Sequence, residues 1–157
     1  MRRVVFAVIW SIVAIGPALA DVRILSSPGG VASDYLKFFS RVRQSGERVV
    51  IDGPCLSACT LVLDVIPRTR ICVTSRAVLG FHAPVVVDSR TGRRFRSRDA
   101  THAVAASYPA SVRAWIRQNG GLTQKLIFFA AVNSRHCIHG ASDACNKRAR
   151  ETADIGG

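Results

Sequence analysis

The sequence has 157 residues, of which 48% are hydrophobic, and it carries a formal net charge of +12 at pH 7. Such a positive field favours anionic partners such as lipid headgroups, phosphates or acidic proteins. The length excludes more than one sizeable domain, because a chain of this size buries one modest core.

The first 20 residues are typical of a secretory signal peptide. Arg2 and Arg3 form a charged start, an apolar run follows, and Pro17 breaks it shortly before the small residues that end at Ala20. The apolar run is shorter than the roughly 20 residues that a membrane-spanning helix needs. We therefore expect cleavage after Ala20, export to the periplasm or the exterior, and no stable membrane span in the mature chain.

The mature chain divides into a domain and a tail. We expect residues 21–145 to form a single domain, and residues 146–157, which are polar and without apolar periodicity, to form a flexible C-terminal tail. The arginine-rich residues 90–98, within a loop expected over residues 87–98, would suit phosphate contacts. Export argues against nucleic acid as a partner, so we interpret this segment as a long solvated loop.

Short strands and helices alternate in the mature part. The expected strands cover residues 22–25, 48–52, 71–73 and 77–81. The expected helices cover residues 31–44, 57–65 and 99–107 and a segment that begins at Pro109. Strand, helix and strand joined by short connections predict an α/β domain built on crossover units, with a helical C-terminal half that ends in an apolar stretch over residues 122–132.

The sequence contains five cysteines, all in the mature part. In an oxidising compartment we expect these cysteines to form disulfides, and their odd number leaves one cysteine without a partner in this set. Cys137 and Cys145 flank a short polar loop, and a bond between Cys59 and Cys72 would tie a helix to the next strand. These four are the disulfide candidates and Cys55 is the expected leftover, although connectivity does not follow from sequence.

A zinc site is the alternative use of the last two cysteines. His136 and His139, with Cys137 and Cys145, would supply two imidazoles and two thiolates, which form a tetrahedral set. The adjacency of His136 and Cys137 lacks the usual two-residue gap between ligands. We therefore expect no metal, and the sequence indicates no other cofactor.

Three segments carry the chemistry. The first is the glycine loop Ser27-Pro28-Gly29-Gly30 after a short apolar run, the second is Ser57 between two cysteines, and the third is His82. Acyl transfer by serine needs an imidazole to take the hydroxyl proton and backbone N–H donors for the oxyanion. Gly29 and Gly30 after a strand, with Ala58 after the serine, are candidate donors, because glycine lets the backbone approach a substrate closely.

Together these motifs resemble the proteolytic subunit of Clp protease and its exported, single-chain relatives. The resemblance rests on the glycine loop, on Ser57 before a small-residue helix, and on His82 in Gly80-Phe81-His82-Ala83-Pro84, and it covers about residues 22–84. It implies the crotonase-like fold of stacked β-β-α units. It also implies that Ser57 is the nucleophile, that His82 is the general base, and that Gly29 or Gly30 forms the oxyanion hole with Ala58.

The third member of the family's triad is an aspartate on a later helix. The corresponding residues 122–130 contain no acidic side chain. Asn133 and Asp143 are the candidate third members, provided that the fold brings one of them to His82. Without such a partner the imidazole lacks charge stabilisation.

Each candidate also has a purely structural interpretation. Ser57 would serve well as a helix N-cap, His82 as a histidine at a sheet edge, and His102 as a solvent-facing residue on an alanine-rich helix. Two functions follow from these alternatives. The first is a periplasmic serine hydrolase that acts on a peptide or small ester, and the second is a non-catalytic member of the fold that binds a peptide or an anionic envelope ligand. The oligomeric state is not predicted.

Overall fold

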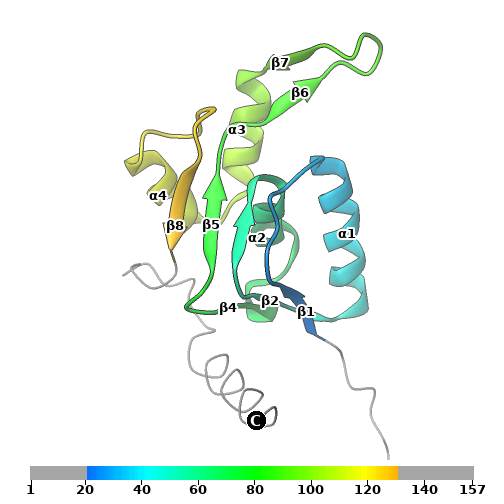
Figure 1. Ribbon diagram of the computed structural model, residues 1–157, viewed down its shortest axis with the longest axis vertical. Coiled ribbons are helices and arrows are strands. Elements are labelled where there is room, and N and C mark those ends of the chain that lie inside the picture. The colour runs from blue at the N-terminus through cyan, green and yellow to red at the C-terminus, as the bar shows by residue number, and fades with distance from the viewer. Residues whose placement is uncertain (1–20, 131–157) are drawn as a thin grey trace, which may run out of the picture.

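The computed structural model describes residues 21–130, which form small sheets and helices in a mixed α/β arrangement (Figure 1). The expected signal peptide and C-terminal tail lie outside these residues. So do the following predicted site residues: Asn133, Asp143, Cys137 and Cys145. Within residues 21–130, no helix is long and apolar enough to cross a membrane.

Two three-stranded sheets form the body of the structure. The first is parallel, in the order β1-β2-β4, and consists of β1 (Asp21–Ile24), β2 (Arg48–Ile51) and β4 (Ile71–Val73). The second has the order β3-β5-β8 and consists of β3 (Pro54–Leu56), β5 (Val78–Phe81) and β8 (Ile127–Ala130). In this second sheet β3 and β5 are parallel, and β8 is antiparallel to β5.

Successive segments of the chain from β1 to β5 alternate between the two sheets. Ser27, which follows β1, forms a parallel bridge with Cys55 of β3, and the Ser27 N–H donates to the Pro54 carbonyl at 2.7 Å. Likewise β2 leads into β3, and β4 leads into β5. Three successive segments therefore each contribute first to the parallel sheet and then to the second sheet.

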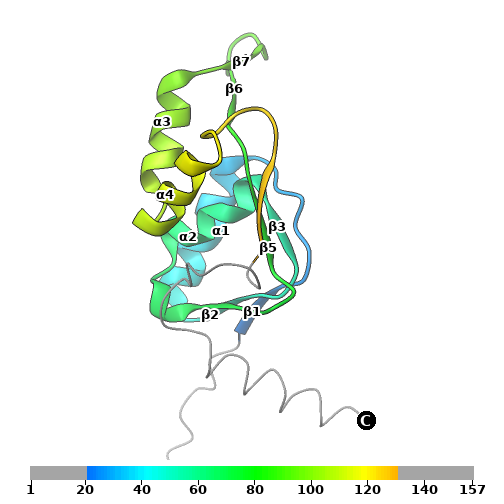
Figure 2. The same ribbon diagram turned by 90° about the vertical axis from the view of Figure 1, so that its left-hand side faces the viewer.

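The helices gather on one side of the strands (Figure 2). They are α1 (Ala32–Ser45), α2 (Val62–Val65), α3 (Arg98–Ser107) and α4 (Ala110–Gln118), with 3-10 turns η1 (Ser57–Leu61) and η2 (Arg68–Arg70). Helix α1 buries Phe39 and Val42 and ends at Gly46, whose φ of 82° is the left-handed geometry that glycine adopts freely. The expected helix over residues 31–44 is thus confirmed.

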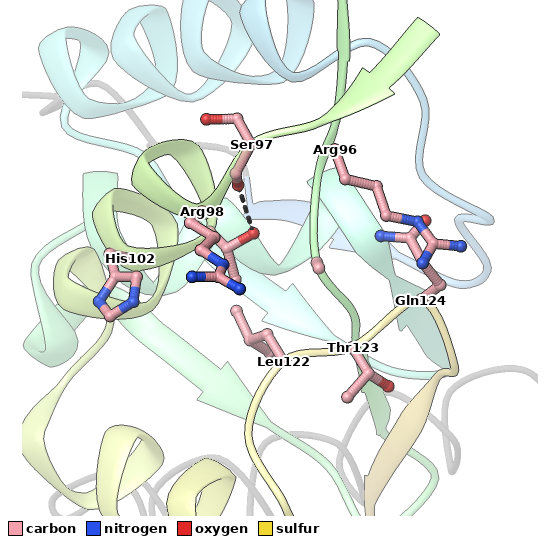
Figure 3. Close-up of a pocket in the computed structure, with 9 residues that line it drawn as sticks. Arg96, Ser97, Arg98, His102, Leu122, Thr123 and Gln124 are labelled. Atoms are coloured by element: carbon pink, nitrogen blue, oxygen red, sulfur yellow. Dashed lines mark hydrogen bonds between the residues drawn. The ribbon is translucent and has the colours of Figure 1, made fainter.

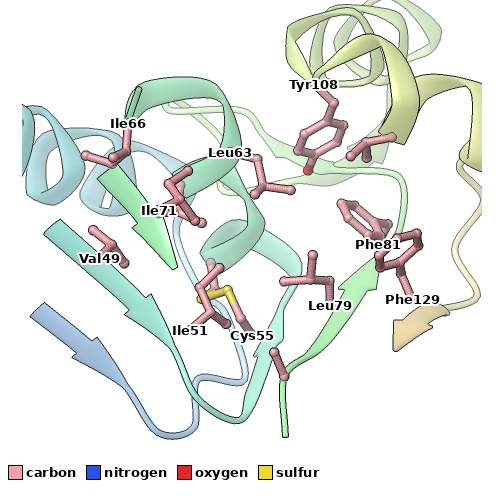
Figure 4. Packing of buried hydrophobic residues seen from close by; sticks show 14 of the residues in the cluster. Val49, Ile51, Cys55, Leu63, Ile66, Ile71, Leu79, Phe81, Tyr108 and Phe129 are labelled. Carbon is pink, nitrogen blue, oxygen red and sulfur yellow. A yellow bond between two sulfur atoms is a disulfide. The ribbon is translucent and has the colours of Figure 1, made fainter. Parts of the chain in front are cut away.

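The hydrophobic core lies between strands and helices (Figure 4). It includes Ile51, Leu79 and Phe81 from strands, and Leu63 and Ile66 from the α2 region, all at most 4% exposed. Burial of each such side chain contributes about 1.5–3 kcal/mol. This packing fixes the ends of β3 and β5, which carry the residues considered below.

The expected loop over residues 87–98 is confirmed only for the largely exposed turn at residues 88–93, and the prediction was wrong for the segments on both sides of that turn, which form a β-hairpin. Strands β6 (Val85–Val87) and β7 (Arg94–Arg96) pair antiparallel. The Asp88 carboxylate accepts hydrogen bonds from the backbone N–H groups of Arg90 and Thr91 and so closes the turn. Such carboxylate-to-backbone bonds make Asp a turn residue, a signal that the arginine content obscured.

The C-terminal half is also not purely helical. Strand β8 lies within the apolar stretch after α4 and pairs with β5, with Phe129 opposite Leu79. Strand β3 was likewise not expected, because Gly53-Pro54 predicts a direct turn into the helix. A Cβ at Gly53 would collide with the Leu25 carbonyl oxygen, so the two backbone segments pass close to each other before the chain enters the second sheet.

Candidate active site

Ser57 and His82 meet at the carboxyl ends of two neighbouring parallel strands. Leu56, the last residue of β3, pairs with Gly80 in β5, so the residues that follow both strands share one edge of the sheet. Nε2 of His82 lies 2.7 Å from Oγ of Ser57. Both side chains are half-buried, so their hydrogen bond is sheltered but reachable from solvent.

The other ring nitrogen of His82 defines the tautomer. Nδ1 lies 2.7 Å from the Ala83 carbonyl oxygen, which can only accept a hydrogen bond. The proton of a neutral ring therefore resides on Nδ1, and Nε2 presents its lone pair to the Ser57 hydroxyl. This is the arrangement that a general base requires. Among the described residues, no carboxylate bonds to the ring.

The backbone of Ser57 is strained. Its φ of 55° is the one positive φ found at a non-glycine residue within residues 21–130. A left-handed serine costs of order 1–3 kcal/mol, and such residues cluster at functional sites. Ser57 makes no side-chain capping bond, because Leu56 occupies the N-cap position of η1. The interpretation of Ser57 as a helix N-cap is therefore wrong.

The glycine loop packs closely against the backbone and Cβ of Ser57. A Cβ on Gly29 would lie 2.6 Å from both the Leu56 carbonyl oxygen and the Ser57 Cβ, and φ of Gly29 is 87°. Only glycine fits this position. The N–H groups of Gly29 and Gly30 donate to no other described residue. Ala58 lies in the first turn of η1, where an N–H has no intrahelical acceptor.

Two residues that the sequence did not indicate hold the Ser57 backbone. The Thr60 hydroxyl donates to the Ser57 carbonyl at 2.7 Å, and the Tyr108 hydroxyl lies 2.7 Å from Thr60 Oγ1. Because the Thr60 proton is already used, Tyr108 is the donor in the second bond. Burial raises the pKa of Tyr108 and keeps the phenol protonated as a donor. A tyrosine 48 residues from its partner carries no local sequence signal.

A cleft of about 690 Å³ opens over Ser57 and His82. The glycine loop and the start of α1 form one wall, and the hairpin forms another through Val85, Val87 and Arg94. Leu61, Val104 and Tyr108 supply further apolar surface. The cleft has the size and apolar lining of sites that bind small molecules or short chain segments.

The cysteines that bracket Ser57 are bonded to each other. Cys55 lies in β3 and is buried in the core, Cys59 lies in η1, and the two form a disulfide (Figure 4). The predicted pairing of Cys59 with Cys72 and the prediction that Cys55 is left over were therefore wrong. Both side chains are fully buried and face the same interior from the two sides of the Ser57 turn, a proximity that their spacing alone did not indicate.

His102, the other histidine considered in the sequence analysis that lies within residues 21–130, does not line this cleft. His102 on α3 is exposed, as expected. It lines a separate hollow of about 390 Å³, with Arg98 beside it and with Arg96 and Gln124 across from it (Figure 3). Within residues 21–130, no group of three or more potential metal ligands occurs. The residues of the alternative zinc site, His136, Cys137, His139 and Cys145, lie outside the described part.

The sequence matches no protein-family model, and a search among curated proteins finds no significant match.

Proposed function

We propose that this protein is a serine hydrolase that uses Ser57 as nucleophile and His82 as general base. The observation that carries the proposal is the 2.7 Å contact between Ser57 Oγ and His82 Nε2, on a ring whose Nδ1 proton is held by the Ala83 carbonyl. A structural hydrogen bond would not need the strained φ of 55° that turns Ser57 toward the cleft.

The reaction follows from these contacts. The Ser57 hydroxyl transfers its proton to Nε2 while Oγ bonds to the substrate carbonyl carbon, and the carbonyl π pair moves to oxygen. Collapse of this intermediate breaks the bond to the leaving group, which takes the proton from Nε2. Water then gives a proton to Nε2 and attacks the acyl-enzyme, and that proton returns to Ser57 Oγ when the acid departs.

The oxyanion would be stabilised by backbone donors. The N–H groups of Gly29 and Gly30 have no acceptor among the described residues, and Gly29 packs against the Ser57 turn. With the N–H of Ala58 they form a candidate oxyanion hole beside the nucleophile. One such donor contributes about 2.7–4 kcal/mol to transition-state stabilisation in subtilisin, which sets the expected scale here.

The proposed relationship is to exported relatives of the Clp protease proteolytic subunit. The alternation of strands between two sheets supports it, because stacked β-β-α units produce that order. The disulfide supports an extracytoplasmic location, where such bonds persist. The Ala83 carbonyl occupies the position at Nδ1 that an aspartate takes in a full triad. It fixes the tautomer without adding negative charge, so we expect slow turnover.

Hydrolysis of 4-nitrophenyl butyrate by the folded protein tests the proposal. We expect Ser57→Ala to reduce kcat/KM by at least about 10³-fold, a scale set by the loss of a nucleophile in serine proteases. Ser75→Ala is the matched control, because Ser75 is exposed and lies outside the cleft. Equal rates in wild type and Ser57→Ala would overturn the proposal and favour the non-catalytic binding function.

A further inference from the structure

The hairpin turns one of its faces toward the nucleophile. Val87 of β6 pairs with Arg94 of β7, and paired residues of antiparallel strands project on the same side. Val85, Val87 and Arg94 of this face line the cleft that contains Ser57 and His82, whereas Arg96, which pairs with Val85, lines the separate hollow beside His102. The hairpin extends beyond the end of β5 beside α3 in both views (Figures 1 and 2).

Arg94 is the charged group of this cleft. Among the described residues that line it, Arg94 is the one arginine or lysine, and none is acidic. No hydrogen bond or ion pair joins its guanidinium to another residue within 21–130. By contrast Arg23, Arg48 and Arg76 are each paired with an aspartate. Arg94 therefore presents unused donors to whatever enters the cleft.

We infer that Arg94 makes the Ser57 site selective for acyl substrates that carry a carboxylate on an apolar scaffold. The inference rests on the proposed hydrolase function and names its substrate class. A guanidinium binds a carboxylate through two parallel hydrogen bonds, and one guanidinium balances one negative charge. A monoanion therefore fits this cleft better than a doubly charged phosphate.

The apolar part of the substrate follows from the other lining residues. Val85 and Val87 are 39% and 55% exposed on the hairpin face that also carries Arg94. Leu61 and Val104 extend the apolar lining. A substrate with a short hydrocarbon segment between its scissile carbonyl and its carboxylate would cover these side chains while its charge reaches Arg94.

Three esters test the inference in the folded protein. The neutral reference is 4-nitrophenyl butyrate, the second ester is 4-nitrophenyl hemiglutarate, and the third is 3-carboxy-4-nitrophenyl butyrate, with the carboxylate on the leaving group. For each variant the readout is kcat/KM for a charged ester divided by that for the neutral ester. We expect Arg94→Gln to lower this ratio about tenfold for at least one charged ester, the scale of a hydrogen bond to a charged group.

Arg93→Gln is the matched control, because it removes the same charge from the same hairpin at a residue outside the cleft lining. We expect it to keep the wild-type ratio. The inference is overturned if Arg94→Gln leaves both ratios unchanged, or if Arg93→Gln lowers them equally through the general positive field. In those cases hydrolysis of the neutral ester still supports the proposed function. A wild type that hydrolyses none of the esters overturns both.

Discussion

Ser57 is held in its unusual geometry from several directions. Gly29 packs behind its Cβ, Thr60 donates to its carbonyl, and His82 binds its hydroxyl. The neighbouring cysteines are bonded to each other across the turn. A single left-handed serine persists only where its surroundings enforce it. The convergence of these contacts on one half-buried serine that lines the cleft is expected of a pre-organised nucleophile.

Tyr108 provides a test of this positioning at the residue scale. In Tyr108→Phe the hydroxyl that donates to Thr60 is lost, while the ring contact with Phe81 is kept. We expect unfolding to become easier by about 1 kcal/mol and kcat to fall several-fold, because the Thr60 hydroxyl is then free to turn away from the Ser57 carbonyl. Thermal unfolding and ester hydrolysis measure the two effects. A variant with lower stability and unchanged kcat would show that Tyr108 has only a structural role.

At the scale of elements, the disulfide joins Cys55 of β3 to Cys59 of η1 around the proposed nucleophile Ser57. For the double variant Cys55→Ala/Cys59→Ala, we expect a loss of about 2 kcal/mol of stability, because the loop that the bond closes is short. We also expect kcat/KM to fall about tenfold or more, since the strained φ of Ser57 loses one of its constraints. Activity is measured well below the unfolding temperature of the variant. A folded variant with wild-type kcat/KM would refute this role of the disulfide.

Most individual helices and strands could be predicted from the sequence, but the pairing of strands could not. Hydrophobic periodicity and Gly46 were sufficient for α1, and an apolar run was sufficient for β2, because both signals are local. The hairpin and β8 were missed, since β8 depends on pairing with β5, which lies far away in the chain. Motif spacing indicated Ser57 and His82. The Ala83 carbonyl and Tyr108 gave no signal, because a backbone oxygen has no sequence signature and a distant hydroxyl is placed only by the fold.

For the whole molecule, Asp52 links stability to pH. This buried carboxylate follows β2 and accepts hydrogen bonds from Arg76, Thr74 and Arg23, so it ties the ends of β1, β2 and β4 together. The pKa of Asp52 lies far below its usual value, chiefly because Arg76 donates hydrogen bonds to the carboxylate. The hydrogen bonds from Thr74 and Arg23 lower this pKa further. A depressed folded pKa stabilises the protein above the unfolded pKa of about 3.9, and this contribution is lost as pH falls below it.

Asp52→Asn should therefore lose about 2 kcal/mol of stability at pH 7, because it weakens the hydrogen bonds to a buried charged acceptor while both arginine partners stay partly exposed to solvent. Its free energy of unfolding should also decline less steeply than that of wild type below about pH 4. Urea unfolding between pH 2 and pH 7 measures both quantities. Asp99→Asn is the control, because Asp99 is exposed and its carboxylate forms no hydrogen bond or ion pair with another residue within 21–130. If the free energy of unfolding falls equally steeply below pH 4 in Asp52→Asn and in wild type, this account is contradicted.

The central claim is that Ser57 is an activated nucleophile, and labelling with a fluorophosphonate tests it most directly. The probe reacts with a serine whose proton is taken by a base, so the account predicts labelling of the folded protein, with the modified peptide mapped to Ser57. Labelling should disappear in Ser57→Ala and fall strongly in His82→Gln. The absence of labelling in the folded wild type, or labelling mapped to another serine, would contradict the claim.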